Sequence, residues 1–380
     1  MKSGRGPLDG IRIIEVAGIG PVPFCAMMLA DHGAEVIRVD RPGKPPMPND
    51  PMMRGRRSIV VDIKTQEGAA IIRKLAATAD GLVEGFRPGA MEAFGLGPDT
   101  LCAANPRLVY GRMTGWGQTG LYADRAGHDI NYIALSGVLS TMGPPEGPPT
   151  IPVNYLGDYA GGAMMLAFGI LAGLLKAKAT GEGDVIDCAM TDGSALIGTI
   201  TWHLQQIGEH QGPSGSNLLD GGAPFYGVYR CADGELISLG SLEPQFYMRL
   251  LNVLDLTDDP LFKNQYNQTL WSEQRETLEA LFATHPSAHW DKLLFEADLC
   301  YAPVLSPTDA AKHPHNKARE TFRIVDGFLQ PAPAPRIASH ERSAENAGPT
   351  EVGAHTNEVL DMLGYDDRSI EALRAGGIVA

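Results

Sequence analysis

Hydrophobic and polar positions follow a repeating order in the first part of the chain. A short β-branched run at residues 11–18 precedes an apolar helical pattern that ends at Gly33, and a second strand pattern follows at 35–42. The same order recurs between residues 58 and 86, and residues 107–115 add another strand pattern. Strands that alternate with helices predict an α/β fold, with a parallel Rossmann-like sheet covered by helices.

The second part of the chain changes pattern several times. Residues 159–181 predict a long helix that is apolar on nearly every face and is therefore buried. Residues 225–240 alternate around Ala232-Asp233-Gly234 as in a β-hairpin, and helical patterns from Gln245 to about Ala297 complete a smaller α/β unit. Residues 328–349 are proline-rich and indicate a linker before a last helix at 355–364.

These patterns predict more than one domain. A chain of 380 residues is long for one compact core. The predicted segments are a large domain at 1–188, a linker at 189–225, a small α/β domain at 226–314, a linker at 315–332 and a carboxyl-terminal segment at 333–380 that returns to the large domain.

Composition and charge narrow the class of protein. Hydrophobic residues make up 44% of the chain and charged residues 20%, as in ordinary soluble proteins, and no apolar run approaches the length of a membrane span. The net charge of −14 argues against a nucleic-acid partner. The 5 cysteines are scattered and never form a CxxC pair, so we expect no metal site and a reducing, cytoplasmic location. The amino terminus has no apolar signal-peptide core.

A turn at residues 18–23 is similar to a dinucleotide-binding fingerprint. Gly18 and Gly20 are present, and Asp40 follows about twenty residues later, where dehydrogenases bind a ribose. Position 23 is proline, however, so the glycine pattern is incomplete. We favour a tight turn in an α/β protein. An NADP-dependent dehydrogenase, with Arg41 at a 2′-phosphate, is the alternative from another class.

Positive charge is concentrated near the predicted strand ends. The residues are Arg38, Arg41, Arg54, Arg56, Arg57, Lys64 and Arg87. Guanidinium groups that converge at the mouth of a sheet can pair with phosphates, which predicts a phosphate-rich small ligand. A solvated turn over residues 54–57 is the simpler interpretation of that part of the cluster.

One imidazole and two carboxylate side chains are candidates for proton transfer. His128 lies in a loop after a strand, Asp158 precedes the long helix, and Glu243 follows a strand of the predicted hairpin. Taken alone, His128 suits a structural role and Asp158 suits a helix cap.

Several longer strings resemble a known family. They are GPLDGIRIIEVAGIGPVPFCAMMLADHGAEVIRVDRPG, VEGFRPG, RMTGWGQTGLYADRAGHDINY, NYLGDYAGG, DGGAPFY and LEPQFY. From about residue 7 to about residue 340, the chain is similar to the α-methylacyl-CoA racemases of the family III CoA-transferase fold. The resemblance implies a 2-methylacyl-CoA thioester substrate, no cofactor beyond that coenzyme A, and an interlocked homodimer with its active site at the subunit interface.

The resemblance also implies roles for particular residues. The catalytic histidine falls on His128 and the catalytic aspartate on Asp158, and a glutamate from the other subunit that hydrogen-bonds the histidine falls on Glu243. The implied coenzyme A contacts are Arg41, Val61, Asp62, Ile63, Lys64, Gly85, Phe86 and Arg87, together with the backbone of Gly127, His128, Asp129, Ile130, Asn131 and Tyr132. One arginine of the family is Ala93 here.

Racemisation explains why such groups are needed. A proton must leave one face of the α-carbon and another must arrive on the opposite face, so two acid/base groups with reactive atoms roughly 5 to 7 Å apart are expected. Backbone N–H groups at the start of the Asp158 helix are expected to receive the charge on the thioester oxygen. A family III CoA-transferase, with Asp158 as nucleophile and no need of His128, is the close alternative. A non-catalytic coenzyme A-binding protein is the third.

Overall fold

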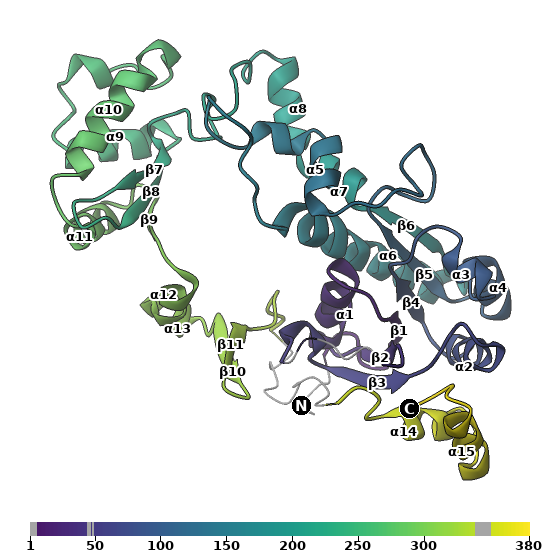
Figure 1. The fold of residues 1–380 in the computed structure, drawn as a ribbon. Coiled ribbons are helices and arrows are strands. Elements are labelled where there is room, and N and C mark those ends of the chain that lie inside the picture. Colours follow the sequence, from purple (N-terminus) through teal and green to yellow (C-terminus); the bar gives the residue numbers. More distant parts are fainter. Residues whose placement is uncertain (1–5, 44–46, 48, 339–350) are drawn as a thin grey trace. The chain divides into compact units, whose positions relative to one another are not determined.

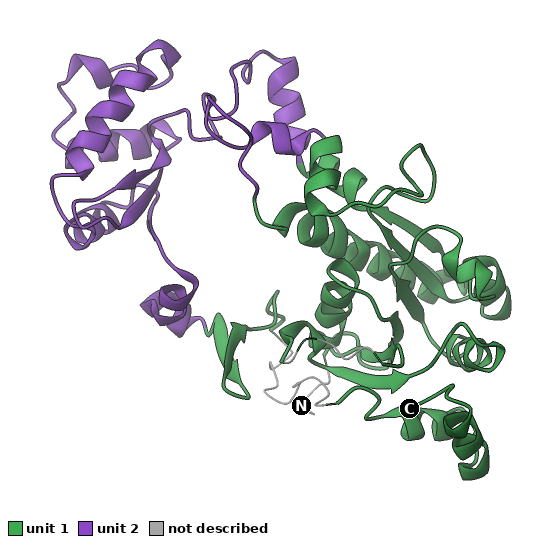
Figure 2. Cartoon of the chain, viewed as in Figure 1, with its two compact units in different colours: residues 1–136, 152–197, 320–380 green, residues 137–151, 198–319 purple. Residues whose placement is uncertain are grey.

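The chain divides into two compact units. The computed structural model describes residues 6–43, 47, 49–338 and 351–380. The first unit comprises residues 1–136, 152–197 and 320–380, and the second comprises residues 137–151 and 198–319 (Figure 2).

A six-stranded parallel sheet forms the centre of the first unit (Figure 1). In spatial order its strands are β3 (Arg56–Val60), β2 (Glu35–Asp40), β1 (Arg12–Val16), β4 (Gly81–Glu84), β5 (Val109–Thr114) and β6 (Val185–Ala189). The order of the strands reverses between β1 and β4, and ligands of such sheets bind beyond the carboxyl ends at that point. The predicted Rossmann-like α/β fold is confirmed.

Helices cover both faces of this sheet. On one face lie α2 (Gln66–Ala76), α3 (Ala90–Ala93), α4 (Pro98–Ala104), α14 (Thr356–Met362) and α15 (Asp367–Ala375). On the other face lie α1 (Pro21–Asp31), the π-helix η3 (Tyr155–Ala163), α6 (Met164–Thr180) and α7 (Met190–Ile197). Two short helices of this unit are η1 (Pro51–Met53) and α5 (Asp129–Leu135). Period-3.6 apolar positions explain the packing, as where Ile71, Ile72 and Leu75 of α2 are fully buried.

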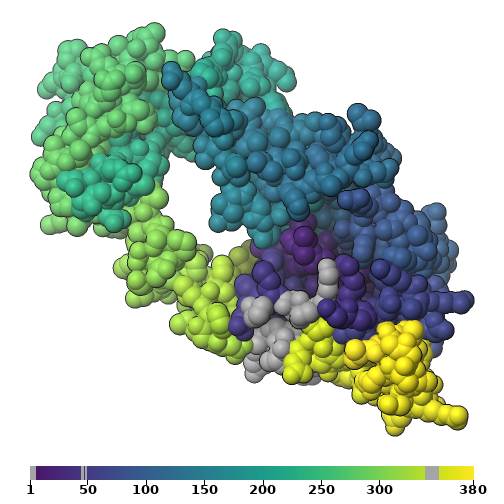
Figure 3. All heavy atoms as spheres, viewed as in Figure 1, coloured from purple at the N-terminus to yellow at the C-terminus, as the bar shows by residue number. Residues whose placement is uncertain are grey.

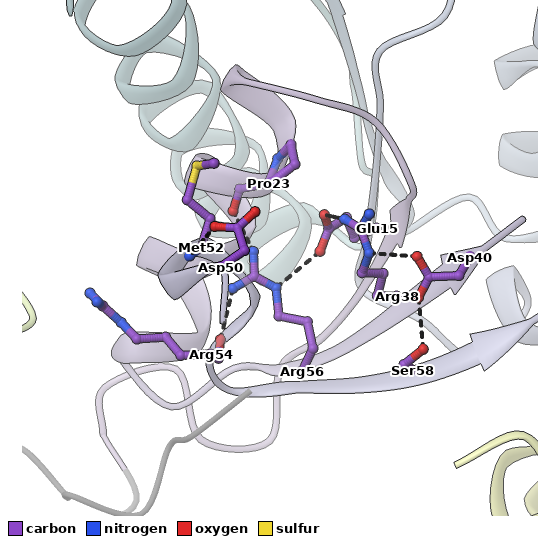
Figure 4. A network of polar contacts seen from close by, with 9 residues as sticks. All are labelled: Glu15, Pro23, Arg38, Asp40, Asp50, Met52, Arg54, Arg56 and Ser58. Carbon is purple, nitrogen blue, oxygen red and sulfur yellow. Dashed lines mark hydrogen bonds and ion pairs between the residues drawn. The ribbon is translucent and has the colours of Figure 1, made fainter. Parts of the chain in front are cut away.

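A network of buried charges ties α1 to the first three strands (Figure 4). Glu15 pairs with both Arg38 and Arg56, and Arg38 also donates to Asp40 at 2.8 Å. Although burial acts to lower it, the ion pairs with Glu15 and Asp40 raise the pKa of Arg38.

Two further contacts of this network fix the ends of α1. Arg56 donates to the carbonyl oxygen of Pro23, in the first turn of α1. Arg54 forms a bidentate pair with Asp31, the last residue of the helix, at 2.8 and 2.6 Å. The network therefore sets both where α1 begins and where it ends.

The carboxyl-terminal residues complete the edge of the sheet at β3. The N–H of Ser58 donates to Nδ1 of His355, its carbonyl accepts the N–H of His355, and its hydroxyl accepts the N–H of Gly353. Beyond β3, the N–H of Asp62 donates to the carbonyl of Ile378. In Figure 3 the yellow carboxyl-terminal residues lie beside dark-blue residues of the first unit. Exposed backbone groups of an edge strand are thereby paired.

The long apolar helix differs from its prediction in two ways. It begins at Tyr155 and its first part, η3, is a π-helix, which then runs directly into α6. It is also not buried on every face, because Met164, Phe168, Leu171 and Leu175 are 50%, 72%, 38% and 70% exposed. By length and mean hydropathy of 1.7, residues 155–180 could cross a membrane, but Leu166 and Ile170 of this stretch are buried against the sheet, as in a core helix.

The second unit has a core of its own. An antiparallel sheet of β7 (Tyr226–Arg230), β8 (Leu236–Gly240) and β9 (Tyr301–Val304) contains the predicted hairpin. Its remaining helices are η2 (Val138–Thr141), α8 (Thr199–Gln206), α9 (Pro244–Val253), η4 (Pro260–Phe262), η5 (Gln268–Leu270), α10 (Trp271–Phe282), α11 (Ser287–Ala297), α12 (Pro307–Lys312) and α13 (Pro314–Ala318). Phe225, Trp271 and Phe282 are central to its aromatic core.

The segment boundaries differ in detail from those predicted. The predicted end of the large domain at residue 188 lies within β6, which continues into α7, and residues 189–225 contain α7 and α8 rather than only a linker. Residues 322–331 form a hairpin of β10 (Phe322–Val325) and β11 (Phe328–Pro331), where the sequence indicated linkers. Residues 339–350 of the predicted proline-rich linker lie outside the described residues. A further helix, α15, follows the predicted last helix.

We predict that Glu15→Gln destabilises the first unit. The neutral amide leaves Arg38 and Arg56 as buried cations without an equal counter-charge, and breaking a buried pair costs roughly 3–5 kcal/mol. Urea unfolding followed by circular dichroism would measure the change. The matched control is Glu371→Gln, whose carboxylate is 76% exposed in a surface pair with Arg374 and should leave the midpoint unchanged. Equal midpoints for the two variants would contradict the prediction.

Candidate active site

A pocket opens at the carboxyl ends of the strands in the first unit. Its lining residues are Val16, Ala17, Val39, Asp40, Arg41, Val61, Asp62, Ile63, Lys64, Phe86 and Phe94. They come from β1 and β2, from the segments that follow β1, β2, β3 and β4, and from the residue after α3. The walls are mostly apolar, and Arg41 and Lys64 are exposed at the surface. This composition suits a flat organic ring with phosphates beside it.

Several residues expected to contact coenzyme A gather here. Arg41, Phe86 and the whole segment from Val61 to Lys64 line the pocket. Gly85 and Arg87 flank Phe86 after β4, and both are exposed. Gly85 lies close to α1: a Cβ there would be 3.1 Å from Cγ2 of Val22, which would then have to shift slightly.

The turn after β4 is held by a buried carboxyl group. Glu84 accepts the N–H of Phe86 at 2.7 Å and a contact from Nε of Arg112 at 3.3 Å. Burial nevertheless raises the pKa of Glu84 to about 7. Sequence reasoning missed Glu84 and Phe94 in this region, because Glu84 lies in a strand that reads as core and Phe94 follows the short helix α3.

The predicted convergence of arginines is wrong for part of the cluster. Arg54, Arg56 and Arg57 precede or open β3, so they lie at the amino edge of the sheet, opposite the pocket. Arg54 and Arg56 are buried in ion pairs, as is Arg38. A solvated turn is therefore also the wrong interpretation. Among the described residues, Arg41, Lys64 and Arg87 are exposed cations at the carboxyl edge.

The turn after β1 lacks the chemistry of a dinucleotide site. Gly20, with φ of +67°, is the cap of α1, and Pro21 and Pro23 occupy the first turn. Prolines have no N–H, so this helix end offers few donors to a pyrophosphate. Both oxygens of Asp40 are also occupied, by Arg38 and by the hydroxyl of Ser58. These contacts oppose the dehydrogenase alternative.

His128 lies at the amino end of α5 and its side chain is exposed. Its N–H donates to Oδ1 of Asn131 at 3.0 Å, which holds the backbone of the histidine in an extended conformation at the helix cap. Tyr132, one turn along, donates its hydroxyl to the carbonyl of Gly127 and packs edge-on against Trp116 at 4.7 Å between ring centroids. The loop that carries His128 is thus fixed on both sides.

Asp158 lies inside η3 and not before the helix, so its expected role as a helix cap is wrong. Asn154 is the capping residue, and its Nδ2 donates to Oδ2 of Asp158 at 2.9 Å. A Cβ on Gly20 would lie 3.2 Å from the same oxygen, so the Asp158 carboxylate faces the turn after β1. Asn154 was not predicted, although its spacing of four residues from Asp158 is the signal that could have found it.

Asp129 links the two predicted catalytic residues. Its Oδ2 accepts the N–H of Asp158 at 2.7 Å, and it directly follows His128 in the chain. The histidine and Asp158 are therefore brought together at the carboxyl edge of the sheet. Of the N–H groups at the start of the Asp158 helix, which were expected to receive the charge on the thioester oxygen, that of Asp158 is already bonded to Asp129. For the other N–H groups of this helix start the expectation stays a prediction. The separation of the reactive atoms of His128 and Asp158 stays a prediction.

Glu243, the third predicted catalytic residue, belongs to the second unit. It caps α9 with an extended backbone, its side chain is exposed, and Pro244 follows at the first helical position.

Comparison with known proteins identifies the family. A sequence profile of CoA-transferase family III matches residues 8–356. The chain belongs to this family. It is 42% identical to alpha-methylacyl-CoA racemase of Homo sapiens over 373 residues, which span 98% of this chain and 97% of that protein. It is 32% identical to succinyl-CoA:glutarate CoA-transferase of Mus musculus, over 98% of this chain and 90% of that one. The family membership predicted from the sequence is confirmed.

A solved structure of the family agrees with the fold. A CAIB/BAIF family protein from Brucella suis superposes with a TM-score of 0.80 at 25% sequence identity, covering 95% of this chain and 100% of that chain.

Proposed function

We propose that this family III protein is an alpha-methylacyl-CoA racemase, an isomerase that interconverts the (R) and (S) forms of 2-methylacyl-CoA thioesters. The observation that carries the proposal is the hydrogen bond from the N–H of Asp158 to Asp129, which joins the segments that carry the two proposed proton-transfer groups, His128 and Asp158. The higher identity to the human racemase than to the mouse CoA-transferase supports the same conclusion.

The reaction proceeds by removal and return of a proton. One of the two side chains takes the α-proton, and the electron pair of the broken C–H bond moves into the thioester to give an enolate. The other side chain then donates a proton to the opposite face of the α-carbon, and the carbonyl is restored. Because both side chains are needed in each direction, they exchange roles when the reaction reverses.

The enolate oxygen needs a hydrogen-bond donor. The first N–H groups of α5, those of Asp129 and Ile130, have no acceptor within a helix and lie directly after His128. These amides suit the thioester oxygen better than those of η3, where Asp129 already occupies the N–H of Asp158. Donors fixed before the reaction stabilise developing charge without reorganisation.

Coenzyme A is the proposed ligand of the strand-end pocket. The apolar walls formed by Val61, Ile63 and Phe86 suit the adenine ring, and Arg41 and Lys64 suit the phosphates. Burial and the Asp158 carboxylate raise the pKa of Tyr132, and the charge of Arg87 partly offsets them, so Arg87 is within electrostatic reach of the helix that follows His128. The pantetheine arm would therefore run from the pocket past Arg87 to the proton-transfer groups.

The active enzyme is proposed to be a homodimer whose active site lies at the subunit interface. The apolar stripe of α6, formed by Met164, Phe168, Leu171 and Leu175, recurs at helical spacing and is exposed in the single chain. A second subunit would cover it. Glu243 of the partner subunit would then accept a hydrogen bond from His128 and hold its imidazole in one tautomer.

A CoA-transferase of the same family is the remaining rival. Such an enzyme uses an aspartate at the position of Asp158 as a nucleophile and releases its acyl group to an acceptor acid. It has no need of His128. Activity without an acceptor acid therefore separates the two functions.

We predict that the wild-type protein incorporates deuterium from heavy water at the α-carbon of a 2-methylacyl-CoA and equalises its epimers, with no acceptor acid present. His128→Ala and Asp158→Asn should each lower the rate of racemisation by about 100-fold or more, because each removes one of the two proton-transfer groups. Mass spectrometry and chiral chromatography would measure exchange and epimer ratio.

The matched control for the histidine is His203→Ala, an exposed histidine of α8, which should leave the rate unchanged. Exchange at the full rate in His128→Ala would remove His128 from the mechanism. Acyl transfer to added carboxylic acids, with no racemisation in their absence, would favour the transferase.

We predict that Arg41→Ala and Lys64→Ala each weaken the binding of coenzyme A by about tenfold, because each removes a charge-assisted contact to phosphate. Isothermal titration calorimetry with free coenzyme A would measure the Kd. Lys178→Ala, at an exposed lysine of α6, is the control. Unchanged affinity in both pocket variants would place the phosphates elsewhere.

We predict that Phe168→Glu turns a dimer into a monomer, because the charge would have to be buried in the subunit interface. Sedimentation velocity at micromolar concentration would measure the mass. Arg368→Glu changes an exposed residue of α15, away from the stripe, and should leave the dimer intact. A monomeric wild type, or a dimeric Phe168→Glu, would contradict this interface.

A further inference from the structure

We propose that the side chain of Asp129 is a positioning residue, which sets the distance and orientation of His128 relative to Asp158. The inference rests on the proposed racemase function and adds a residue to it. The role concerns the carboxylate, and is separate from any contact that the backbone of residues 127–132 makes with coenzyme A.

The contacts of Asp129 join two elements that come from different parts of the chain. Asp129 is the first residue of α5, and its Oδ2 accepts the N–H of Asp158 in η3 at 2.7 Å across 29 residues of sequence. The N–H of Gly157 also donates to this carboxylate. Because Oδ1 has no donor among the described residues, both amides act on Oδ2, and a shift of α5 along η3 would break these contacts.

The glycine at position 157 allows this approach. A Cβ there would lie 2.6 Å from Oδ2 and 2.9 Å from Cγ of Asp129, which is closer than atoms can approach. The backbone of η3 therefore comes against the carboxylate only because residue 157 has no side chain. In the sequence this feature is visible as the segment LGD, in which Gly157 directly precedes Asp158.

Burying the carboxyl group of Asp129 in these surroundings lowers the stability of the fold, which a purely structural group would not need to do. The residue is only 6% exposed, and its Oδ1 is buried without a hydrogen-bond donor among the described residues. Burial, together with the nearby Asp158 carboxylate, raises the pKa of Asp129 against the effect of the two amide donors. A buried carboxyl with one oxygen unpaired costs stability, and such costs are concentrated where a group serves a functional site.

The consequence for the reaction follows from its geometry. Each proton-transfer atom must approach the same α-carbon from its own side, and a misplacement of about 1 Å can cost 10²-fold in rate. Asp129 touches neither the α-carbon nor the exchanged proton in this scheme. Its loss should therefore lower kcat and leave KM for the thioester nearly unchanged.

The experiment compares Asp129→Ala, Asp129→Asn and Gly157→Ala with the wild type in heavy water, with kcat and KM measured separately. Asp129→Ala should lose about 100-fold in kcat with KM within about twofold. Asp129→Asn keeps an oxygen that accepts the N–H of Asp158 and should retain most of the wild-type kcat. Gly157→Ala retains Asp129 but displaces its carboxylate, so it should reproduce the loss. Asp124→Ala, an exposed aspartate of the same loop, is the control.

The outcomes separate this inference from the proposed function. A wild type without α-proton exchange would refute the racemase function itself. With an active wild type, a kcat in Asp129→Ala above half of the wild-type value overturns the positioning role, as does an Asp129→Asn variant that loses as much as Asp129→Ala. If Asp129→Ala does not fold, the test rests on Gly157→Ala. The positioning role is then overturned if Gly157→Ala has both the unfolding midpoint and the kcat of the wild type.

Discussion

The ion pairs of Glu15 with Arg38 and Arg56 are the contacts on which the site depends. They lie on the face of the sheet that α1 covers, and Arg56 also holds the carbonyl of Pro23. The position of α1 decides where the turn at Gly20 lies, and that turn contacts the carboxylate of Asp158. Buried charges within the strands thus support chemistry at their carboxyl ends.

Much of the fold could be predicted because its signals are local. Short β-branched runs between helical patterns give the strands β1 to β5, and the register of a parallel sheet then brings their carboxyl ends to one edge. Partners far apart in sequence could not be predicted. Arg54 pairs with Asp31, and Ser58 pairs with His355, beside the edge strand β3. No local pattern in the sequence indicates either pair. A run of arginines looks the same in sequence whether it is solvated, phosphate-binding or buried.

The site was predicted residue by residue through family resemblance and not through local pattern. By pattern alone Asp158 reads as a helix cap, since the helical periodicity is clear only after it. The π-helix begins three residues earlier, and such helices are frequent at functional sites because the wider turn re-aims a side chain. Glycines at 161 and 193 let η3 and α7 approach closely, since a Cβ on Gly193 would lie 1.9 Å from the carbonyl oxygen of Gly161.

The pairing of the carboxyl-terminal residues with β3 has a consequence for synthesis. Ser58 leaves the ribosome early, whereas its partners Gly353 and His355 are made 295 and 297 residues later. Until then the nascent sheet presents an open edge to other chains, and termination before these residues would leave that edge open permanently. Synthesis of residues 353–355 is therefore itself a step in protecting this protein from aggregation.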